Sequence, residues 1–396
     1  MKKTLCLACI VSTSFFLSGC WDYSPLGNNY IITGVGIDVD QASPDKILVS
    51  FVGPAQTKSS GSSSSGASGS STQQNSYSIV SSSGESIRSA ATDAQNKTGQ
   101  NLSVNNLRVI VFSEDVARKG ISIYLDSFLR NVQINSNTLI LVTEGTAKEL
   151  LSFKSEDISR IPMYLIDLVS STDYQTKPDF CTLKEVTYAL NSKYKAFVIP
   201  YIILNPKEKE ITYKNICLFK EDKMIDILSE SESIAYFLLS GIFKKDEYVL
   251  DSEHTDNITK EGSSFNLFSE KRKINANITN GQATFDLMFR LRGETTEQVS
   301  INIMMNSETS QSTNEFDSLQ KKDDNKISSL IKLSITKVLK KLQTEHKVDS
   351  IGFGEYVRVK YPDYFKKISW DEEFQKANFN IDVEVDIKKC GIIKSE

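Results

Sequence analysis

Two segments in the second half of this 396-residue chain alternate between apolar and polar residues. Gln282–Arg292 places an apolar side chain at every second position, and Phe379–Lys388 repeats the pattern. A period of two gives a β-strand one apolar and one polar face, so each segment predicts a strand that is covered on one side only. Asn280-Gly281 precedes the first segment and predicts a tight hairpin turn, with Lys273–Thr279 as its other arm. We therefore expect an antiparallel sheet here, with one face packed on a helix.

The helix that covers this sheet is predicted at residues 327–346. Its apolar residues recur every three or four positions and form one stripe, while lysines occupy the opposite side. Such a stripe is typical of a helix that packs on a core, and we prefer this interpretation to a role on a membrane surface. A further strand is expected at Val299–Met305, between the hairpin and the helix.

The first half of the chain shows a different pattern, in which apolar runs alternate with capped helices. The runs that predict strands are Ile47–Val52, Leu107–Phe112, Thr138–Val142 and Phe197–Leu204. Helix starts are indicated by capping residues at Ser82, Ser113, Thr146 and Thr182, and Gly99 is the expected end of the first helix. This alternation predicts an α/β region built on a mixed sheet.

Near Pro206 the pattern changes. Ile211–Phe219 and Met224–Ile227 flank a polar turn and predict a hairpin, and an apolar helix that includes Ile234 and Phe237 follows. The fold class expected for the chain is α+β and multidomain, with mixed and antiparallel sheets packed with helices. We expect an N-terminal α/β domain over residues 20–205 and a C-terminal α+β domain over residues 206–396. A division of the second domain near residues 250–270 is an alternative.

A serine/glycine tract at residues 57–76 interrupts the first domain. It has too few apolar residues to offset the entropy lost on ordering, so it predicts a disordered surface loop. The tract lies between the strand-like runs Ile47–Val52 and Tyr77–Val80. Because the cost of closing a loop grows slowly with its length, two paired strands tolerate such an insertion. We interpret the tract as a loop within a domain, not as a linker between domains.

The N-terminus has the pattern of an export signal that ends in a lipid-attachment site. Two lysines precede the apolar residues 5–17, a stretch shorter than the roughly 20 residues of a membrane-spanning helix. Leu17-Ser18-Gly19-Cys20 then matches a bacterial lipobox. We expect cleavage of residues 1–19 between Gly19 and Cys20. Cys20 would then carry a diacylglyceryl group, often with a further acyl chain such as palmitate, as a stable anchor. The alternative is an ordinary signal peptide that happens to contain a cysteine.

Composition excludes several classes of site. The formal net charge is −4, and the loss of two signal lysines makes the mature chain more acidic, so we expect no nucleic-acid partner. The two histidines lack the spacing of metal ligands, which predicts no transition-metal site. Cys181, Cys217 and Cys390 are expected to be buried thiols, with one disulfide among them as the alternative.

Motifs that could carry catalysis are incomplete. The glycine motif at residues 34–38 lacks the third glycine and the capped helix of a dinucleotide-binding loop, so Asp38 and Asp40 are interpreted as strand-end residues that face solvent. Ser192 and Ser329 each begin the S-x-x-K pattern of penicillin-interacting enzymes, but the lysine-threonine-glycine element at residues 97–99 precedes both instead of following. We therefore expect no enzyme, no catalytic residues and no cofactor.

One known family fits these pieces in chain order. Cys20-Trp21-Asp22, followed by residues 31–38 (IITGVGID), resembles the N-terminus of the GerC-type spore germination lipoproteins. Residues 106–120 (NLRVIVFSEDVARKG) and 216–226 (ICLFKEDKMID) resemble later parts of the family. Residues 351–355 (IGFGE), with KYPDYFKKISWDEEF and VEVDIKKCGII, resemble its C-terminal signature. The chain departs from the family in its serine/glycine tract and at Cys390, which leaves the receptor type and the nutrient open.

The resemblance implies several α+β domains that extend outward from a lipid on Cys20, without catalytic activity. It implies a subunit of a nutrient germinant receptor, with two integral membrane partners (the A and B subunits), on the outer face of the spore inner membrane. Such a subunit would be needed for the response to small-molecule germinants. Gly352 and Gly354 are interpreted as turn residues in preference to partner contacts. The alternatives are a solute-binding lipoprotein of an importer and a cell-wall hydrolase, which the late alternating strands and the missing nucleophile, respectively, disfavour.

Overall fold

A computed structural model describes residues 28–55, 77–155, 158, 160–170, 181–191, 196–243, 245–250, 262–299 and 313–388 of the chain. Several predicted features lie outside these residues: the signal peptide at 1–19, the lipobox cysteine Cys20, the tract at 57–76, the S-x-x-K motif that begins at Ser192, and Cys390. The strand predicted at Val299–Met305 also lies outside them, apart from Val299.

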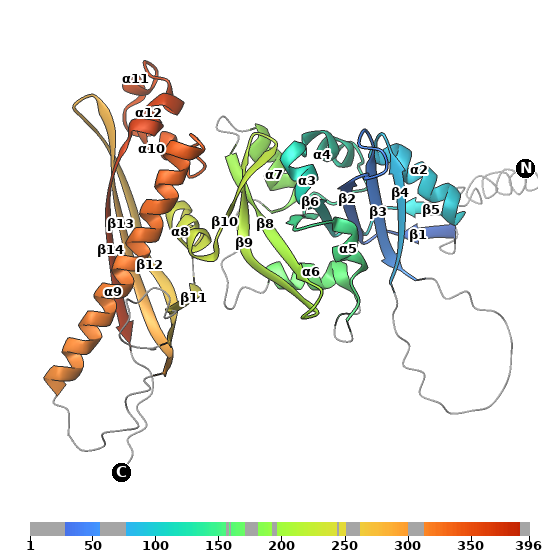
Figure 1. Ribbon diagram of the computed structural model, residues 1–396. Coiled ribbons are helices and arrows are strands. Elements are labelled where there is room, and N and C mark those ends of the chain that lie inside the picture. Colours follow the sequence, from blue (N-terminus) through green and yellow to red (C-terminus); the bar gives the residue numbers. More distant parts are fainter. Residues whose placement is uncertain are drawn as a thin grey trace, which may run out of the picture.

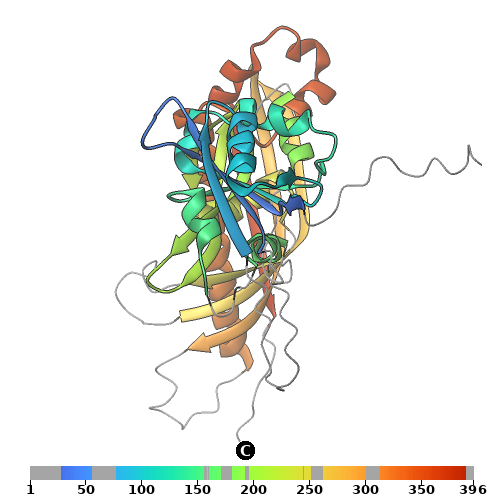
Figure 2. The same ribbon diagram turned by 90° about the vertical axis from the view of Figure 1, so that its right-hand side faces the viewer.

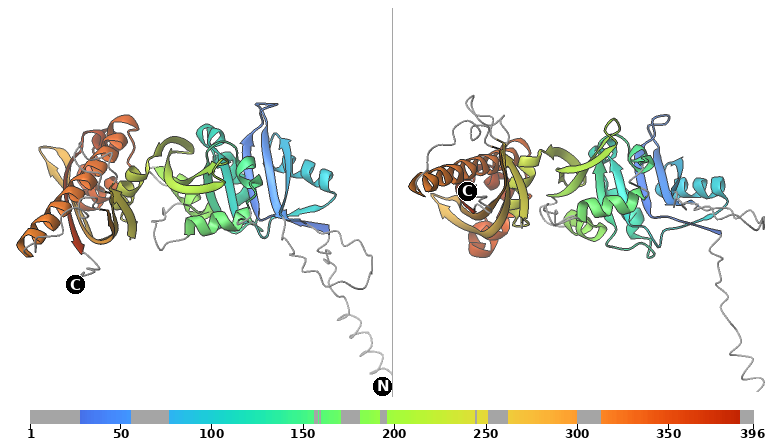
Figure 3. Two further views of the ribbon diagram at one scale, coloured as in Figure 1. Left: turned by 60° about the horizontal axis from the view of Figure 1, so that its bottom comes forward. Right: turned by 90° about the horizontal axis from the view of Figure 1, so that it is seen from below.

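The described chain forms two large sheets that lie side by side along an elongated molecule, together with one short two-stranded sheet (Figures 1 and 3). The first and larger sheet has eight strands in the order β10-β9-β8-β7-β6-β2-β3-β4. Their bounds are β2 (Gly34–Val39), β3 (Ile47–Pro54), β4 (Tyr77–Gly84), β6 (Val109–Ser113), β7 (Leu139–Thr143), β8 (Ala196–Asn205), β9 (Glu210–Lys220) and β10 (Lys223–Leu228). The four central strands are parallel, and an antiparallel pair flanks them on each side. This is the mixed sheet that the alternating runs predict.

Helices cover both faces of the eight-stranded sheet. One face carries α2 (Ile87–Thr98), α3 (Glu114–Lys119), α4 (Ser122–Leu129) and α7 (Leu183–Asn191), whose apolar residues share one core with the sheet. The other face carries α5 (Ala147–Ser152) and α6 (Ile161–Ser170). A short parallel pair, β1 (Asn29–Ile31) with β5 (Asn101–Ser103), lies beside α2 at the end of the molecule from which the N-terminus leaves (Figure 1).

The second sheet has the order β11-β12-β13-β14 and is joined to the first through α8 (Glu230–Ser240). Its strands are β11 (Lys245–Leu250), β12 (Gly262–Thr279), β13 (Gln282–Val299) and β14 (Asn378–Lys388). The hairpin turn predicted at Asn280-Gly281 is confirmed, since these residues join β12 to β13 with φ values of 54° and 77°. Both angles are positive, as the favoured two-residue hairpin turn requires.

The predicted covering helix is confirmed as α9 (Thr313–Lys340), which continues into a π-helical turn, η4 (Lys341–Glu345). Its residues Ile327, Ile331, Ile335 and Val338 are buried. Viewed along the long axis of the molecule, α9 runs beside the second sheet (Figure 2). The helix also protects the edge of that sheet, because Ser328 Oγ and Asp324 Oδ1 accept the N–H groups of Val385 and Ile387 at 3.2 and 3.3 Å.

The expectation of a purely antiparallel second sheet is wrong. β14 pairs with β13 in parallel, with Thr284 opposite Asn378 and Glu294 opposite Lys388. The chain passes from β13 through α9 and three short helices, α10 (Phe353–Lys360), α11 (Pro362–Phe365) and α12 (Trp370–Lys376), before it re-enters the sheet at the end where β13 began. A crossover of this kind produces a parallel pair. One apolar face shows that a strand is half covered, but it does not give the strand's direction.

The two predicted ends of the first helix, α2, have different outcomes. The helix cap predicted at Ser82 is wrong, because residues 82–84 extend β4 opposite β3, and Ser86 caps α2 in a capping box with Ser89. The predicted helix end at Gly99 is confirmed by a φ of 67°. The domain boundary between residues 205 and 206 stays a prediction. In the structure, β9 and β10 follow this boundary in the chain but belong to the first sheet.

Candidate functional site

The predicted lipid-attachment residue, Cys20, and its cleavage partner Gly19 lie outside the described residues. The first strand nevertheless fixes where the chain leaves the fold. Tyr30 of β1 is buried, and its hydroxyl lies 2.5 Å from the Ser78 carbonyl oxygen and 3.0 Å from Ser78 Oγ of β4. Asn28 lies eight positions after Cys20, a distance of at most about 28 Å at roughly 3.5 Å per residue. A lipid on Cys20 would therefore hold the β1 and β5 end of the molecule near the membrane.

The glycine motif in β2 serves packing. A Cβ atom on Gly36 would lie 2.8 Å from Leu151 Cδ1 and 3.0 Å from Ala147 Cβ, so the absence of a side chain lets α5 approach the strand. The prediction that Asp38 faces solvent is wrong, because Asp38 is only 2% exposed. Its carboxylate accepts the Ala147 and Lys148 N–H groups at 2.6 and 3.0 Å. Asp38 thus caps a helix that begins more than a hundred residues later, a contact that no local spacing reveals.

Replacing Asp38 with alanine should lower the free energy of unfolding by about 2 kcal/mol, because two N–H groups at the start of α5 would lose their acceptor. Chemical denaturation followed by far-ultraviolet circular dichroism measures the change. Asp40→Ala is the matched control, since Asp40 is half-buried at the end of the same strand and accepts the N–H of the nearby Ala42, and it should cost under about 1 kcal/mol. Equal losses in the two variants would contradict the capping role.

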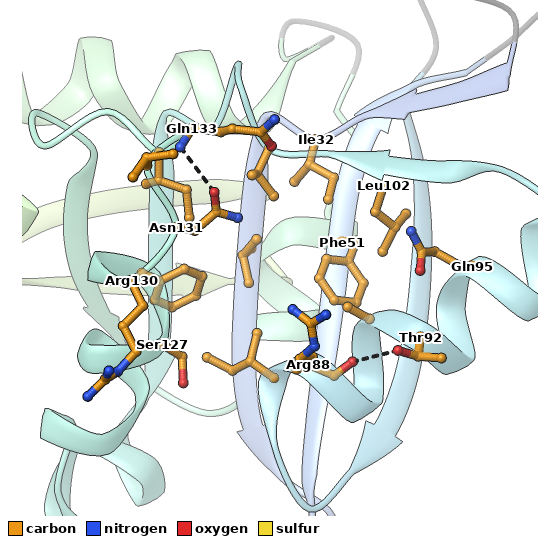
Figure 4. Close-up of a pocket in the computed structure, with 17 residues that line it drawn as sticks. Ile32, Phe51, Arg88, Thr92, Gln95, Leu102, Ser127, Arg130, Asn131 and Gln133 are labelled. Carbon is orange, nitrogen blue, oxygen red and sulfur yellow. Dashed lines mark hydrogen bonds between the residues drawn. The ribbon is translucent and has the colours of Figure 1, made fainter. Parts of the chain in front are cut away.

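A cleft of ≈ 690 Å³ lies between α2 and α4 on the first sheet (Figure 4). We call it the α2/α4 cleft. Its deepest residues are Ile32, Val35, Phe51 and Phe128, which are buried. Half-buried side chains form the upper walls: Ile87, Ala91, Leu102, Val104 and Ile134. The volume is within the range of about 300–1,000 Å³ that is usual for small-molecule sites, and the apolar walls are typical of them.

The charged groups of the α2/α4 cleft are all positive. Of its 17 lining residues, two are arginines and none is acidic. Arg130 forms an ion pair with Asp126 at 2.7 Å and points away from the cleft, whereas Arg88 reaches from α2 toward Phe51 (Figure 4). Within the described part of the chain, no ion pair is found for Arg88. No local pattern in the sequence reveals this site, because its walls come from five separated segments.

A second cluster joins the two halves of the molecule, and we call it the joint. Lys341 Nζ of η4 lies 3.1 Å from both Asp226 Oδ2 of β10 and Glu232 Oε2 of α8. Lys337 Nζ of α9 lies 3.0 Å from Glu232 Oε1, and His346 Nε2 lies 2.9 Å from Asp226 Oδ2. These contacts connect the first sheet and α8 to the helix that covers the second sheet.

Glu232 is the buried centre of the joint, at 2% exposure. Burial alone would raise the pKa of Glu232, but the Ser229 N–H and the two lysines outweigh it and lower the pKa to about 2. Burial alone would lower the pKa of Lys341, but Glu232 and Asp226 raise it. Ser229 and Glu232 also form a capping box at the start of α8. That Ser-x-x-Glu spacing was a sequence signal that could have located Glu232.

A third buried acid, Asp349, organises the segment that resembles the family's C-terminal signature. Its Oδ1 accepts the Gly352 and Phe353 N–H groups at 2.8 and 3.0 Å, and its Oδ2 accepts those of Gly354 and the Trp370 indole at 2.8 and 2.9 Å. Burial raises the pKa of Asp349, and these four donors oppose the rise. The turn expected at Gly352 is confirmed by its φ of 86° at the start of α10, while Gly354 lies within the helix.

The remaining predicted residues are placed as follows. Cys181 and Cys217 are buried in two different cores, and neither forms a disulfide with another described residue. Burial raises the pKa of the Cys217 thiol, which donates to the Ile199 carbonyl at 3.1 Å. In the described ranges, no helix is long and apolar enough to span a membrane, and no cluster of three or more His, Cys, Asp or Glu side chains is arranged to hold a metal ion.

Two domain models of one protein family match the chain in order. The model described as the spore germination protein N-terminal domain matches residues 22–204, and the model described as spore germination B3/GerAC like, C-terminal, matches residues 214–391. Both segments that the sequence resemblance covers are therefore matched independently.

Individual relatives agree with the domain models. Spore germination protein B3 of Bacillus subtilis (strain 168) is 24% identical over 388 residues, which cover 95% of each chain. Spore germination protein KC of the same organism is 22% identical and covers 99% of this chain and 97% of its own. The crystal structure of the GerBC protein superimposes with a TM-score of 0.55 at 18% identity, over 89% of this chain and 96% of that one. The last likeness shows that the α+β fold is shared.

Proposed function

Because the chain belongs to the GerAC-like family of spore germination proteins, we propose that it is the lipid-anchored C subunit of a nutrient germinant receptor. The observation that carries this proposal is the match of two consecutive domain models over residues 22–204 and 214–391. The relatives B3 and KC cover nearly the same length, so the likeness extends to the whole chain and not to one shared module.

The subunit acts through contacts and not through catalysis. The buried acids Asp38, Glu232 and Asp349 are each held by hydrogen bonds or ion pairs that stabilise the fold. The α2/α4 cleft is lined by no acid and no histidine, the groups that general acid or base chemistry uses most. The shared fold with GerBC gives no support to a solute-binding lipoprotein of an importer.

The partners in this proposal are the integral membrane A and B subunits, at the outer face of the spore inner membrane. The lipid on Cys20 supplies the anchor, because two or more acyl chains hold a protein stably at a bilayer. The short segment between Cys20 and β1 would place the first sheet next to those subunits. The second sheet then extends away from the membrane, since it lies at the opposite end of the molecule from β1 and β5 (Figure 1).

Replacing Cys20 with alanine tests the anchor and the assembly together. We expect the variant to be released from the membrane fraction, to lose co-purification with the A and B subunits, and to abolish germination through this receptor. Cys9→Ala is the matched control, because it removes a cysteine of the predicted signal peptide and leaves the lipobox intact. It should behave as the wild type does.

Two outcomes would contradict the proposal at different points. Normal germination with the Cys20→Ala protein in the soluble fraction would show that anchoring is unnecessary. Failure of the wild-type chain to co-purify with any integral membrane germination subunit would remove the receptor assignment itself.

A further inference from the structure

We propose that the α2/α4 cleft binds a small monocarboxylate with an aliphatic or aromatic body, and that Arg88 holds the carboxylate. This site is a property of the isolated chain and does not depend on the receptor partners. It gives the subunit a ligand of its own, in addition to its role as an anchored component.

The shape of the cleft supports a small ligand. The first sheet forms its floor, α2 and α4 form its sides, and residues 131–134 with β5 close one end (Figure 4). The ≈ 690 Å³ would hold a ligand of amino-acid or phenylpropanoid size with several waters. The upper walls are mainly apolar, so the body of the ligand would be apolar as well.

The charge of the cleft selects an anion. A guanidinium offers two parallel N–H donors that match a carboxylate, and Arg88 is directed into the cleft without an ion pair to any described residue (Figure 4). Arg130 points away from the cleft and is paired with Asp126 at 2.7 Å, so Arg88 is the cation better placed to meet the ligand (Figure 4). A single available cation suits a ligand with one negative charge, whereas a nucleotide or polyphosphate would need several cations. The positive charge is a local property of the cleft, since the chain as a whole carries a net charge of −4.

Polar groups at the rim complete the arrangement. Gln95 of α2 and Asn131 beyond α4 line the cleft on opposite sides. The Asn131 Oδ1 atom accepts the Gln133 N–H at 3.0 Å, which leaves the amide nitrogen of Asn131 as a donor toward the ligand. Donors from both sides favour an acceptor-rich head group such as a carboxylate.

The test compares 3-phenylpropionate with the neutral 3-phenylpropionamide. Isothermal titration uses the full lipidated chain in lipid nanodiscs, with empty nanodiscs subtracted. We expect saturable binding of the carboxylate with a Kd on the order of 10⁻⁴ M. The amide should bind about tenfold more weakly, because the charge-assisted contact is lost.

Three variants locate the site. Arg88→Gln should abolish the roughly tenfold preference for the carboxylate, so that both probes bind equally and weakly. Thr92→Trp fills the cleft from an exposed position on α2 and should abolish binding of both probes. Lys97→Gln is the control, since it removes one positive charge from the same helix outside the cleft and should leave both affinities unchanged.

The ratio of the two affinities is informative even if a variant is less stable, because partial unfolding lowers both equally. Equal binding of acid and amide by the wild type would overturn the role of Arg88. Absence of saturable binding, or binding that persists in Thr92→Trp, would overturn the site. Neither result would affect the assignment to a germinant receptor, which rests on the Cys20→Ala experiment.

Discussion

Replacing Asp349 with alanine should lower the free energy of unfolding of the C-terminal half by about 3–5 kcal/mol. The substitution leaves four N–H donors without an acceptor, three of them buried, and each buried unsatisfied donor costs about 1–3 kcal/mol before the structure relaxes. Three of the donors are successive backbone groups at the start of α10, so the turn at Gly352 should loosen with them. The apolar contacts of Phe353 with Phe285 and Phe379 depend on that turn.

Trp370 provides a local measurement of this effect, because its indole N–H donates to Asp349 Oδ2 at 2.9 Å. The chain has two tryptophans, so a Trp21→Phe background makes the fluorescence specific to Trp370. Urea denaturation should show the transition at a much lower midpoint in Asp349→Ala. Asp371→Ala, an exposed acid in α12, is the control and should change stability by under about 0.5 kcal/mol. A loss below about 1 kcal/mol in Asp349→Ala would show that the four contacts are dispensable.

Acidification should weaken the joint through Glu232. The folded-state pKa of about 2 lies below the ordinary pKa of 4.5 for a glutamate, so the carboxylate contributes stability that is fully present above pH 4.5. That contribution is lost as the pH falls through about 2, and its size is about 3 kcal/mol at neutral pH. The charged groups that face Glu232 or its partners are Asp226, Lys337, Lys341 and His346.

Glu232→Gln isolates this contribution. At pH 7 the variant should be less stable than the wild type by about 3 kcal/mol, and the difference should shrink toward zero near pH 2. Urea denaturation over this pH range gives the comparison. Glu345→Gln, which removes an exposed acid at the end of η4, should follow the wild-type curve with a nearly constant offset. A pH-independent difference for Glu232→Gln would indicate that packing, and not charge, makes the residue important.

The sequence predicts what depends on neighbours along the chain. Asn280-Gly281 forms its hairpin, the stripe on α9 faces the core, and Ser113 and Thr146 cap α3 and α5, because the residues involved are within a few positions of each other. The family resemblance extends the prediction further, because ordered motifs along nearly the whole mature chain identify a known arrangement of domains.

The missed features depend on contacts between distant segments. Asp38 contacts residues 109 and 110 positions away, and Glu232 contacts Lys341 at a separation of 109. Both acids were expected on the surface or passed over, since nothing local distinguishes a buried acid from a solvated one. The prediction of an antiparallel β14 failed for the same reason, because the direction of this strand depends on where the crossover connection ends. The Ser229-x-x-Glu232 spacing is a local signal for a helix start, but it does not show that Glu232 is buried against Lys341.

Helix α8 has a consequence for the order in which the chain assembles during synthesis. All eight residues from Glu232 to Leu239 are buried, and the elements that enclose them include α9, which begins some seventy positions later. During synthesis, which delivers the N-terminal end first, the eight strands of the first sheet are complete at Leu228 while α8 still lacks this cover. Ile234, Phe237 and Leu238 are then exposed to water until α9 arrives. We therefore expect nascent chains that end before α9 to be the aggregation-prone forms of this protein, and the ones that depend most on chaperones.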